Sequence, residues 1–280
     1  MAPLRQGGRM GDFDDINTRG LVLVGCGRMG GAMLRGWLAR GLEPGAVTVI
    51  DPRLAPEWQD KGLRVNAALP DDPAVLVLAV KPQMMADALG TLPVLSDTLV
   101  LSVAAGTTIA TFEAAFPGVP IVRVMPNTPA AIGQGISAMI GNTRATPAHL
   151  DLAEALMAAV GRVVRLDHED QMDAVTGLSG SGPAYVFHLI EAMAKAGEAQ
   201  GLPAALSLEL ARMTVAGAGA LAIDADEDPA VLRENVTSPG GTTAAGLAVL
   251  MDPDTGLPPL MARTVAAATA RGRELGKAAQ

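Results

Sequence analysis

Short apolar runs alternate with longer amphipathic or turn-rich segments through the first part of the chain. The runs lie at Leu21–Val24, Val47–Ile50, 75–80, 99–103 and Ile121–Met125. Continuous apolar runs of this length are typical of parallel strands that are covered on both faces. Two further runs, 136–140 and 163–166, predict strands on either side of a helix over about 147–159. The pattern therefore predicts an α/β domain that ends near Asp167.

From residue 169 onward the pattern changes to long segments rich in Ala, Leu and Met, separated by residues that start or stop helices. Pro183 is placed to open a helix that Gly201 ends. Further helices are predicted from Pro203, from Pro229, over 242–251 and over 257–276. A helical surface of this composition is a candidate dimer interface, although its glycines also fit a simple compositional bias.

The composition limits the partners that the chain can have. Lys and Arg number 21 against 29 Asp and Glu, and this net charge of −8 argues against nucleic acid and against an anionic membrane surface. The one cysteine excludes an intrachain disulfide framework and fits a reducing cytoplasm. Residues 1–19 lack the apolar core of a secretory signal and predict a flexible tail. Proline and glycine interrupt the longest uncharged runs, so we expect a soluble protein.

Three glycines follow the first apolar run at G-x-G-x-x-G spacing, in the stretch Gly25-Cys26-Gly27-Arg28-Met29-Gly30. The first glycine allows a tight turn, the second lets a pyrophosphate approach the backbone, and the third lets the next helix close on the strand. Asp51 ends the following run, at about the spacing at which a carboxylate meets a ribose hydroxyl. Glycine-rich turns also occur for steric reasons, but this order of elements favours a Rossmann-type dinucleotide-binding domain over 20–167.

Three successive strand ends carry residues suited to ligand binding. Lys81 follows the run at 75–80, small residues at 102–106 follow the next, and Asn127 lies between two prolines after the third. Each taken singly has a plainer interpretation, as a solvated lysine or an ordinary turn. Because the carboxyl ends of parallel strands meet at one edge of a sheet, the three together predict one crevice.

Two loops rich in glycine and hydroxyl side chains, 176–185 and 235–243, precede helices in the second domain. Consecutive glycines before a helix can turn several N–H groups toward one point and hold a carboxylate. Helix N-capping by Ser or Thr is an equal interpretation for the first loop. In the second loop the hydroxyl side chains of Ser238, Thr242 and Thr243 flank two adjacent glycines, and this favours anion binding.

Other chemistry is sparsely represented. None of the three histidines has a partner at metal-ligand spacing, so no metal site is expected. Cys26 is best interpreted as a small side chain tolerated in the turn, although a helix N-terminus can lower the pKa of a thiol.

Taken together, the motifs at 25–30, 79–82, 102–106, 125–129, 176–185 and 238–243 resemble the Δ1-pyrroline-5-carboxylate reductase family. The resemblance runs from about residue 21 to 275. It implies a Rossmann-type doubly wound sheet followed by an all-helical dimerisation and substrate domain, 168–280. It also implies NADPH or NADH as cofactor, reduction of 1-pyrroline-5-carboxylate to L-proline, and homodimers that often assemble further into decamers. In such dimers the pocket includes helices of the partner subunit.

The resemblance and the motifs together name the candidate site residues. The cofactor is expected to contact Gly25, Cys26, Gly27, Arg28, Met29, Gly30, Asp51, Arg53, Asn66, Ala79, Val80, Lys81, Pro82, Ser102, Val103, Ala104 and Asn127. The substrate is expected to contact Asn235, Ser238, Gly240, Gly241, Thr242 and Thr243. Lys81 and Thr243 are the candidate catalytic residues, and Glu169 falls where an acid approaches the substrate.

The expected chemistry needs little from the protein. A cyclic imine protonated on nitrogen is already a strong hydride acceptor, so the site must align it, hold it and exclude water. The amides around 240–243 would hold its carboxylate, and the Thr243 hydroxyl its ring nitrogen. Many family members have a small or basic residue where this chain has Asp51, which repels the phosphate of NADPH, while Arg53 can compensate. The cofactor preference therefore stays open.

Three other functions compete with this one. A β-hydroxyacid dehydrogenase is expected to carry a catalytic lysine on the long helix after the linker, but Lys195, the one lysine in 183–201, lies well past the loop. A catalytically silent nucleotide sensor does not need the substrate-type loop. A helical scaffold needs neither the glycine motif nor Lys81.

Overall fold

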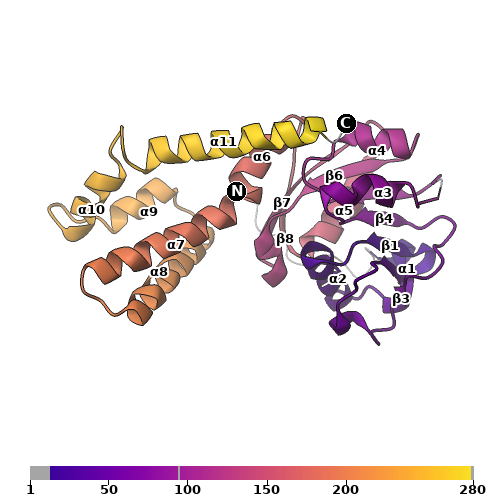
Figure 1. The fold of residues 1–280 in the computed structure, drawn as a ribbon, viewed down its shortest axis with the longest axis horizontal. Helices are drawn as coiled ribbons and strands as arrows, with labels where there is room; N and C mark the ends of the chain where they lie inside the picture. Colours follow the sequence, from indigo (N-terminus) through magenta and orange to yellow (C-terminus); the bar gives the residue numbers. More distant parts are fainter. Residues whose placement is uncertain (1–12, 94, 279–280) are drawn as a thin grey trace. The chain divides into compact units, whose positions relative to one another are not determined.

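The computed structural model describes residues 13–93 and 95–278, and these divide into two compact units (Figure 1). The first unit runs to Gly180 and also takes in the chain from Thr269 onward. The second unit comprises Ser181–Ala268. The first contains a sheet with helices, and the second contains only helices among its described residues, as predicted.

An eight-stranded sheet forms the centre of the first unit. Its strands are β1 (Leu21–Val24), β2 (Val47–Ile50), β3 (Arg64–Val65), β4 (Val75–Leu78), β5 (Leu99–Ser102), β6 (Ile121–Met125), β7 (Gly135–Gly141) and β8 (Gly161–Arg165). They lie in the order β3-β2-β1-β4-β5-β6-β7-β8, and the first six are parallel. β7 runs antiparallel to β6, and β8 runs parallel to β7. The order reverses between β2-β1 and β4, where doubly wound sheets bind ligands outside the carboxyl ends of their strands.

Helices cover both faces of this sheet. They are α1 (Asp14–Arg19), α2 (Arg28–Ala39), α3 (Met85–Leu89), α4 (Ile109–Ala115), α5 (Pro147–Ala158) and α6 (Gln171–Val175). Short 3₁₀ turns η1 (Pro44–Ala46), η2 (Pro56–Trp58), η3 (Pro82–Met84) and η4 (Thr128–Ile132), and a π-helical turn η5 (Thr176–Gly180), connect them.

The continuous apolar runs are explained by two separate cores. Leu21 and Leu23 of β1 pack in a core with Trp37 of α2 and Leu156 of α5, while Val22 and Val24 pack in the other with α3 and α4. Successive side chains of a strand point to opposite faces, so a strand covered on both faces is apolar at every position. The Trp37 indole Nε1 donates a hydrogen bond to the Leu156 carbonyl at 2.8 Å, which satisfies its polar group inside the core.

The compact units of the described structure differ from the expected boundaries at two places. The tail predicted over 1–19 ends in helix α1, because Phe13 and Ile16 are buried in the core; residues 1–12 lie outside the described part. The first unit does not end near Asp167. It continues through α6 to Gly180, because Met172 is buried and Glu169 is bonded to β6.

The second unit consists of helices that begin where the sequence predicts. They are α7 (Gly182–Ala199), α8 (Ala204–Asp224), α9 (Pro229–Asn235), α10 (Thr242–Leu250) and the first part of α11 (Leu257–Ala278). α7 and α8 pack together as a hairpin, with Gly197 of α7 close to Ser207 of α8. Among the described residues, one helix, α8, is long and apolar enough to cross a membrane by length and composition.

Candidate functional site

The glycine motif forms the turn from β1 into α2, and its three glycines play different parts. Gly25 has φ +90°, and a Cβ there would lie 2.9 Å from the backbone of Ala79 and Val80. A Cβ on Gly30 would lie 2.1 Å from the Gly25 carbonyl oxygen. A Cβ on Gly27 would meet nothing within 4 Å, and no side chain caps the start of α2. Two glycines therefore shape the turn, while the third leaves backbone open at a helix N-terminus, which suits a pyrophosphate.

Asp51, at the end of β2, is held against this turn. Its Oδ2 accepts a hydrogen bond from the Cys26 backbone N–H at 2.8 Å, and its Oδ1 accepts one from the Arg53 N–H at 2.8 Å. Asn66 forms two hydrogen bonds with the backbone of Asp51. Its Oδ1 accepts from the Asp51 N–H and its Nδ2 donates to the Asp51 carbonyl, both at 3.0 Å. The carboxylate is thus fixed in place, and the Asn66 amide is used to hold the backbone that carries it.

Cys26 is buried inside the turn. Its pKa is raised to about 11, first because burial disfavours the thiolate and then because Asp51 and Glu57 are negatively charged, against an opposing effect of Arg35. The thiol is therefore protonated at neutral pH and is not an activated nucleophile. This agrees with its interpretation as a small side chain that the turn tolerates.

The ends of β4 and β5 present small residues and one exposed cation. Lys81 precedes η3 with an exposed side chain, and within the described ranges no ion pair involves it. Ser102 is buried, and its Oγ accepts a hydrogen bond from the Ala104 N–H at 3.2 Å. Its hydroxyl therefore shapes the turn after β5, where Ala104 is buried and Val103 is partly exposed.

The structure brings the loop after β6 together with the π-helical turn η5. Asn127 Oδ1 accepts from the Ile136 N–H at 2.9 Å, and its Nδ2 donates to Ser179 Oγ at 3.4 Å. A Cβ on Gly180 would lie 2.5 Å from Met125 Cε, so these two residues are in close contact. Two motifs that lie about fifty residues apart in the sequence therefore form one surface, which the sequence patterns had not connected.

Arg123, a buried residue of β6, was missed by the sequence analysis. Its Nη1 donates to Glu169 Oε1 at 2.7 Å, and the same oxygen accepts from the Ile109 N–H at 2.8 Å. Glu169 therefore binds β6 and the start of α4. The available signal was a lone arginine inside the otherwise apolar run Ile121–Met125.

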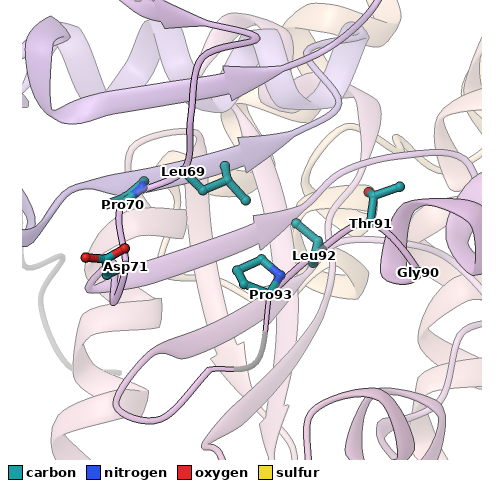
Figure 2. Close-up of a pocket in the computed structure, with 7 residues that line it drawn as sticks. All are labelled: Leu69, Pro70, Asp71, Gly90, Thr91, Leu92 and Pro93. Atoms are coloured by element: carbon teal, nitrogen blue, oxygen red, sulfur yellow. The ribbon is translucent and has the colours of Figure 1, made fainter.

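Two cavities flank the sheet. One, of about 300 Å³, lies beside the Arg123–Glu169 ion pair. It is lined by Gly106, Thr108, Arg123, Glu169, Asp170, Asp173, Arg273 and Gly276. The other, of about 390 Å³, lies between segments 69–71 and 90–93, which face each other in Figure 2. Those segments precede β4 and β5, so the second cavity lies at the amino ends of the strands, opposite the edge where doubly wound sheets bind nucleotides.

The predicted substrate residues lie in the second unit. Asn235 ends α9, Gly240 has φ +71°, and Gly241 precedes α10 in extended conformation. Thr242 and Thr243 are exposed in the first turn of α10, and no side chain caps this helix. Within the described part of the chain, the hydroxyls of Thr242 and Thr243 take part in no hydrogen bond, so the capping interpretation is not supported for this loop.

A doubly wound sheet, an open glycine turn and an acid fixed at the end of β2 define a Rossmann-type, nicotinamide-dependent oxidoreductase with a separate helical unit. The pyrroline-5-carboxylate reductase of Methanosarcina acetivorans is 39% identical over 94% of this chain and 100% of its own length. That of Synechocystis is 40% identical over 92% of this chain and 98% of its own. The chain therefore belongs to the pyrroline-5-carboxylate reductase family.

Family and structure matches agree with this assignment. Residues 169–275 match the family "Pyrroline-5-carboxylate reductase dimerisation", and residues 20–106 match "NADP oxidoreductase coenzyme F420-dependent". A solved pyrroline-5-carboxylate reductase from Coxiella burnetii has a TM-score of 0.80 and 32% identity, and covers 92% of this chain and 98% of its own. One from Plasmodium falciparum, solved with NADP bound, has a TM-score of 0.79 and 28% identity, and covers 93% of this chain and 99% of its own. The predicted fold class and family are confirmed.

Proposed function

We propose that this chain reduces 1-pyrroline-5-carboxylate to L-proline with NADH or NADPH, as the last step of proline biosynthesis. The observation that supports this most directly is that the reductase from Methanosarcina acetivorans aligns with 94% of the chain. The alignment therefore takes in both the glycine turn of the first unit and the loop 235–243 of the second. The reductase function explains both features. The three alternative functions, a β-hydroxyacid dehydrogenase, a silent nucleotide sensor and a helical scaffold, are therefore not required.

The first unit would bind the nucleotide. The N–H groups at the start of α2 face open space beside Gly27, where they can hold the pyrophosphate. The fixed Asp51 carboxylate would accept hydrogen bonds from the adenosine ribose, and we infer a preference for NADH because it repels a 2′-phosphate. When bound, the reduced nicotinamide supplies the hydride. The strand ends at Ala79, Val80, Lys81, Pro82, Ser102, Val103, Ala104 and Asn127 would line the remaining length of the nucleotide.

The loop 235–243 would hold the substrate. Amides around Gly240 to Thr243 precede α10 uncapped, so they can bind the substrate carboxylate at the positive end of the helix. The free hydroxyl of Thr243 would orient the ring nitrogen, and Lys81 would place a positive charge at the carboxyl end of β4. Because a protonated imine is already electrophilic, these residues orient and desolvate it, and no strong acid is required.

Assembly and location follow from the same assignment. Apolar side chains on α7 and α8 are exposed in one subunit, among them Phe187, Leu210 and Met213, and they lie in the stretch matched by the dimerisation family. We infer a dimer that covers them, in the cytoplasm, and a decamer built from five such dimers as its further assembly. The same cover would account for the apolar composition of α8 without a membrane.

Initial rates of NADH and NADPH oxidation, measured in parallel with 1-pyrroline-5-carboxylate, test this proposal. We expect substrate-dependent oxidation of both nucleotides, a higher kcat/KM with NADH, and L-proline as the product. A β-hydroxyacid, assayed with the oxidised nucleotides in parallel, should give no reaction. Binding of nucleotide without oxidation in the presence of the imine would contradict the proposal and favour a sensor.

A further inference from the structure

Every second residue from Arg123 to Asn127 contacts the segment 169–180. Arg123 pairs with Glu169, Met125 packs on Gly180, and Asn127 bonds to Ser179. Alternate side chains of an extended strand point to the same face. One face of β6 and of the residues after it is therefore attached to the segment 169–180 through these three contacts. Both partners belong to the first unit. The ion pair forms the inner end of this attachment, and the Asn127–Ser179 contact forms its outer end at the carboxyl edge of the sheet.

The ion pair is the strongest of the three contacts. The Arg123 side chain is 7% exposed and that of Glu169 is 32% exposed, so the arginine is buried while the carboxylate keeps partial access to water. Charge-assisted hydrogen bonds are short and strong, and this one measures 2.7 Å between Nη1 and Oε1. Losing one partner of a buried pair leaves the other charge without compensation, which is strongly unfavourable. The pair therefore fixes the start of the segment more firmly than the 3.4 Å contact of Asn127 fixes its end.

We propose that Arg123 and Glu169 are positioning residues for the reduction. They act through the segment 169–180, which they hold so that Ser179 meets Asn127 at the carboxyl end of β6. Neither residue touches substrate or nucleotide; the pair sets the geometry of the loop after β6, where the sequence places the crevice. The expected change in kcat rests on the proposed function, whereas the expected change in hydrogen exchange over 169–180 does not depend on it.

The test compares Arg123→Met and Glu169→Ala with the conservative variants Arg123→Lys and Glu169→Gln. Glutamine keeps an acceptor for Ile109 and Arg123, so Glu169→Gln should recover most of the activity that Glu169→Ala loses. We expect Arg123→Met to lower kcat about tenfold or more, with the KM for nucleotide within about twofold of wild type. Arg165→Met is the matched control, because Arg165 of β8 is also an ion-paired strand arginine, but its partners Asp151 and Glu154 belong to α5 and not to the segment.

Two further measurements separate positioning from mere stability. Added guanidinium should restore part of the kcat of Arg123→Ala, because the cavity of about 300 Å³ gives access to the vacated site. The rate of amide hydrogen exchange over 169–180 should rise in Arg123→Met and not in Arg165→Met. This measurement does not require an active enzyme.

The outcomes are distinct. An inactive wild type would refute the proposed function, and the exchange data would still decide whether the pair holds the segment. Wild-type kcat with only a lowered Tm in Arg123→Met and Glu169→Ala would overturn the positioning role. Unchanged exchange over 169–180 in these variants, or kcat and nucleotide KM impaired in parallel, would overturn it as well. If Arg123→Met does not fold, Glu169→Ala decides by the same criteria.

Discussion

At the scale of single residues, Asp51 illustrates how a backbone contact fixes a charge. Both of its carboxylate oxygens accept backbone N–H groups, and Asn66 holds its main chain from the other side. Asp51 and the glycines were predictable because their sequence spacing encodes their function. The bracing role of Asn66 was not, because it depends on φ +47° and on contacts between β2 and the residue after β3.

Asp51→Ser should raise the kcat/KM ratio of NADPH to NADH, since removing the carboxylate removes repulsion worth on the order of 1 kcal/mol or more. Asp51→Asn separates charge from hydrogen bonding, and Asp71→Ser, an exposed acid at the opposite edge of the sheet, is the control. Steady-state kinetics with both nucleotides make the measurement. A wild type that strongly prefers NADPH, with no change in the variants, would show that Arg53 dominates instead.

Thr243→Val should lower kcat/KM for the imine about 5- to 150-fold, or roughly 1 to 3 kcal/mol, because the hydroxyl is free to bind the substrate nitrogen. The KM for nucleotide and the Tm should stay near wild type. Thr264→Val, which removes a hydroxyl bonded within α11, is the control. Kinetics and thermal unfolding of both variants decide: a lowered Tm with unaltered kcat/KM would remove Thr243 from the site.

At the scale of elements, burial decided what could be predicted. Strands covered on both faces could be predicted because they are apolar runs, and helices α7, α8, α9 and α11 because a proline lies at their start. β3 was missed because it has two residues, both exposed. Helix α1 was missed because the charges around Phe13 and Ile16 masked their apolar face, and η5 because a π-helical turn has no sequence signature.

The turn between β1 and α2 allows a matched pair of glycine variants. Gly30→Ala should destabilise the fold by about 1 to 3 kcal/mol or more, because its Cβ would overlap the Gly25 carbonyl. Gly27→Ala should fold normally and raise the KM for nucleotide about tenfold, because its Cβ would point into open space that the pyrophosphate needs. Urea unfolding and nucleotide titration give the two readings. Equal effects of both variants on stability would contradict this division of roles.

At the scale of the whole molecule, α7 and α8 expose several large apolar side chains, among them Phe187, Leu210 and Met213. Exposed apolar patches of this kind mark interaction surfaces. The sequence predicted an interface from composition, but not which side chains form it, since that depends on how the helices pair. Local sequence patterns likewise do not predict how the two units are arranged, whereas they largely predict the fold of each unit.

Met213, which is 66% exposed on α8, should be covered in the dimer, so Met213→Glu should shift the molar mass measured by light scattering toward the monomer and lower activity. Val164→Glu places the same charge on an exposed position of β8, at the edge of the sheet, and is the control. A fully active monomeric wild type would contradict both the interface and a site shared between subunits.

The reaction that we propose for this chain transfers a hydride from the reduced nicotinamide to the carbon of a cyclic C=N bond. The most direct measurement uses NADH carrying deuterium at both C4 positions, with 1-pyrroline-5-carboxylate as the acceptor and mass spectrometry with NMR of the product. We expect L-proline that carries one deuterium from the nicotinamide, located at C5 of the proline. Proline without deuterium at C5, or oxidation of the nucleotide without proline, would contradict it.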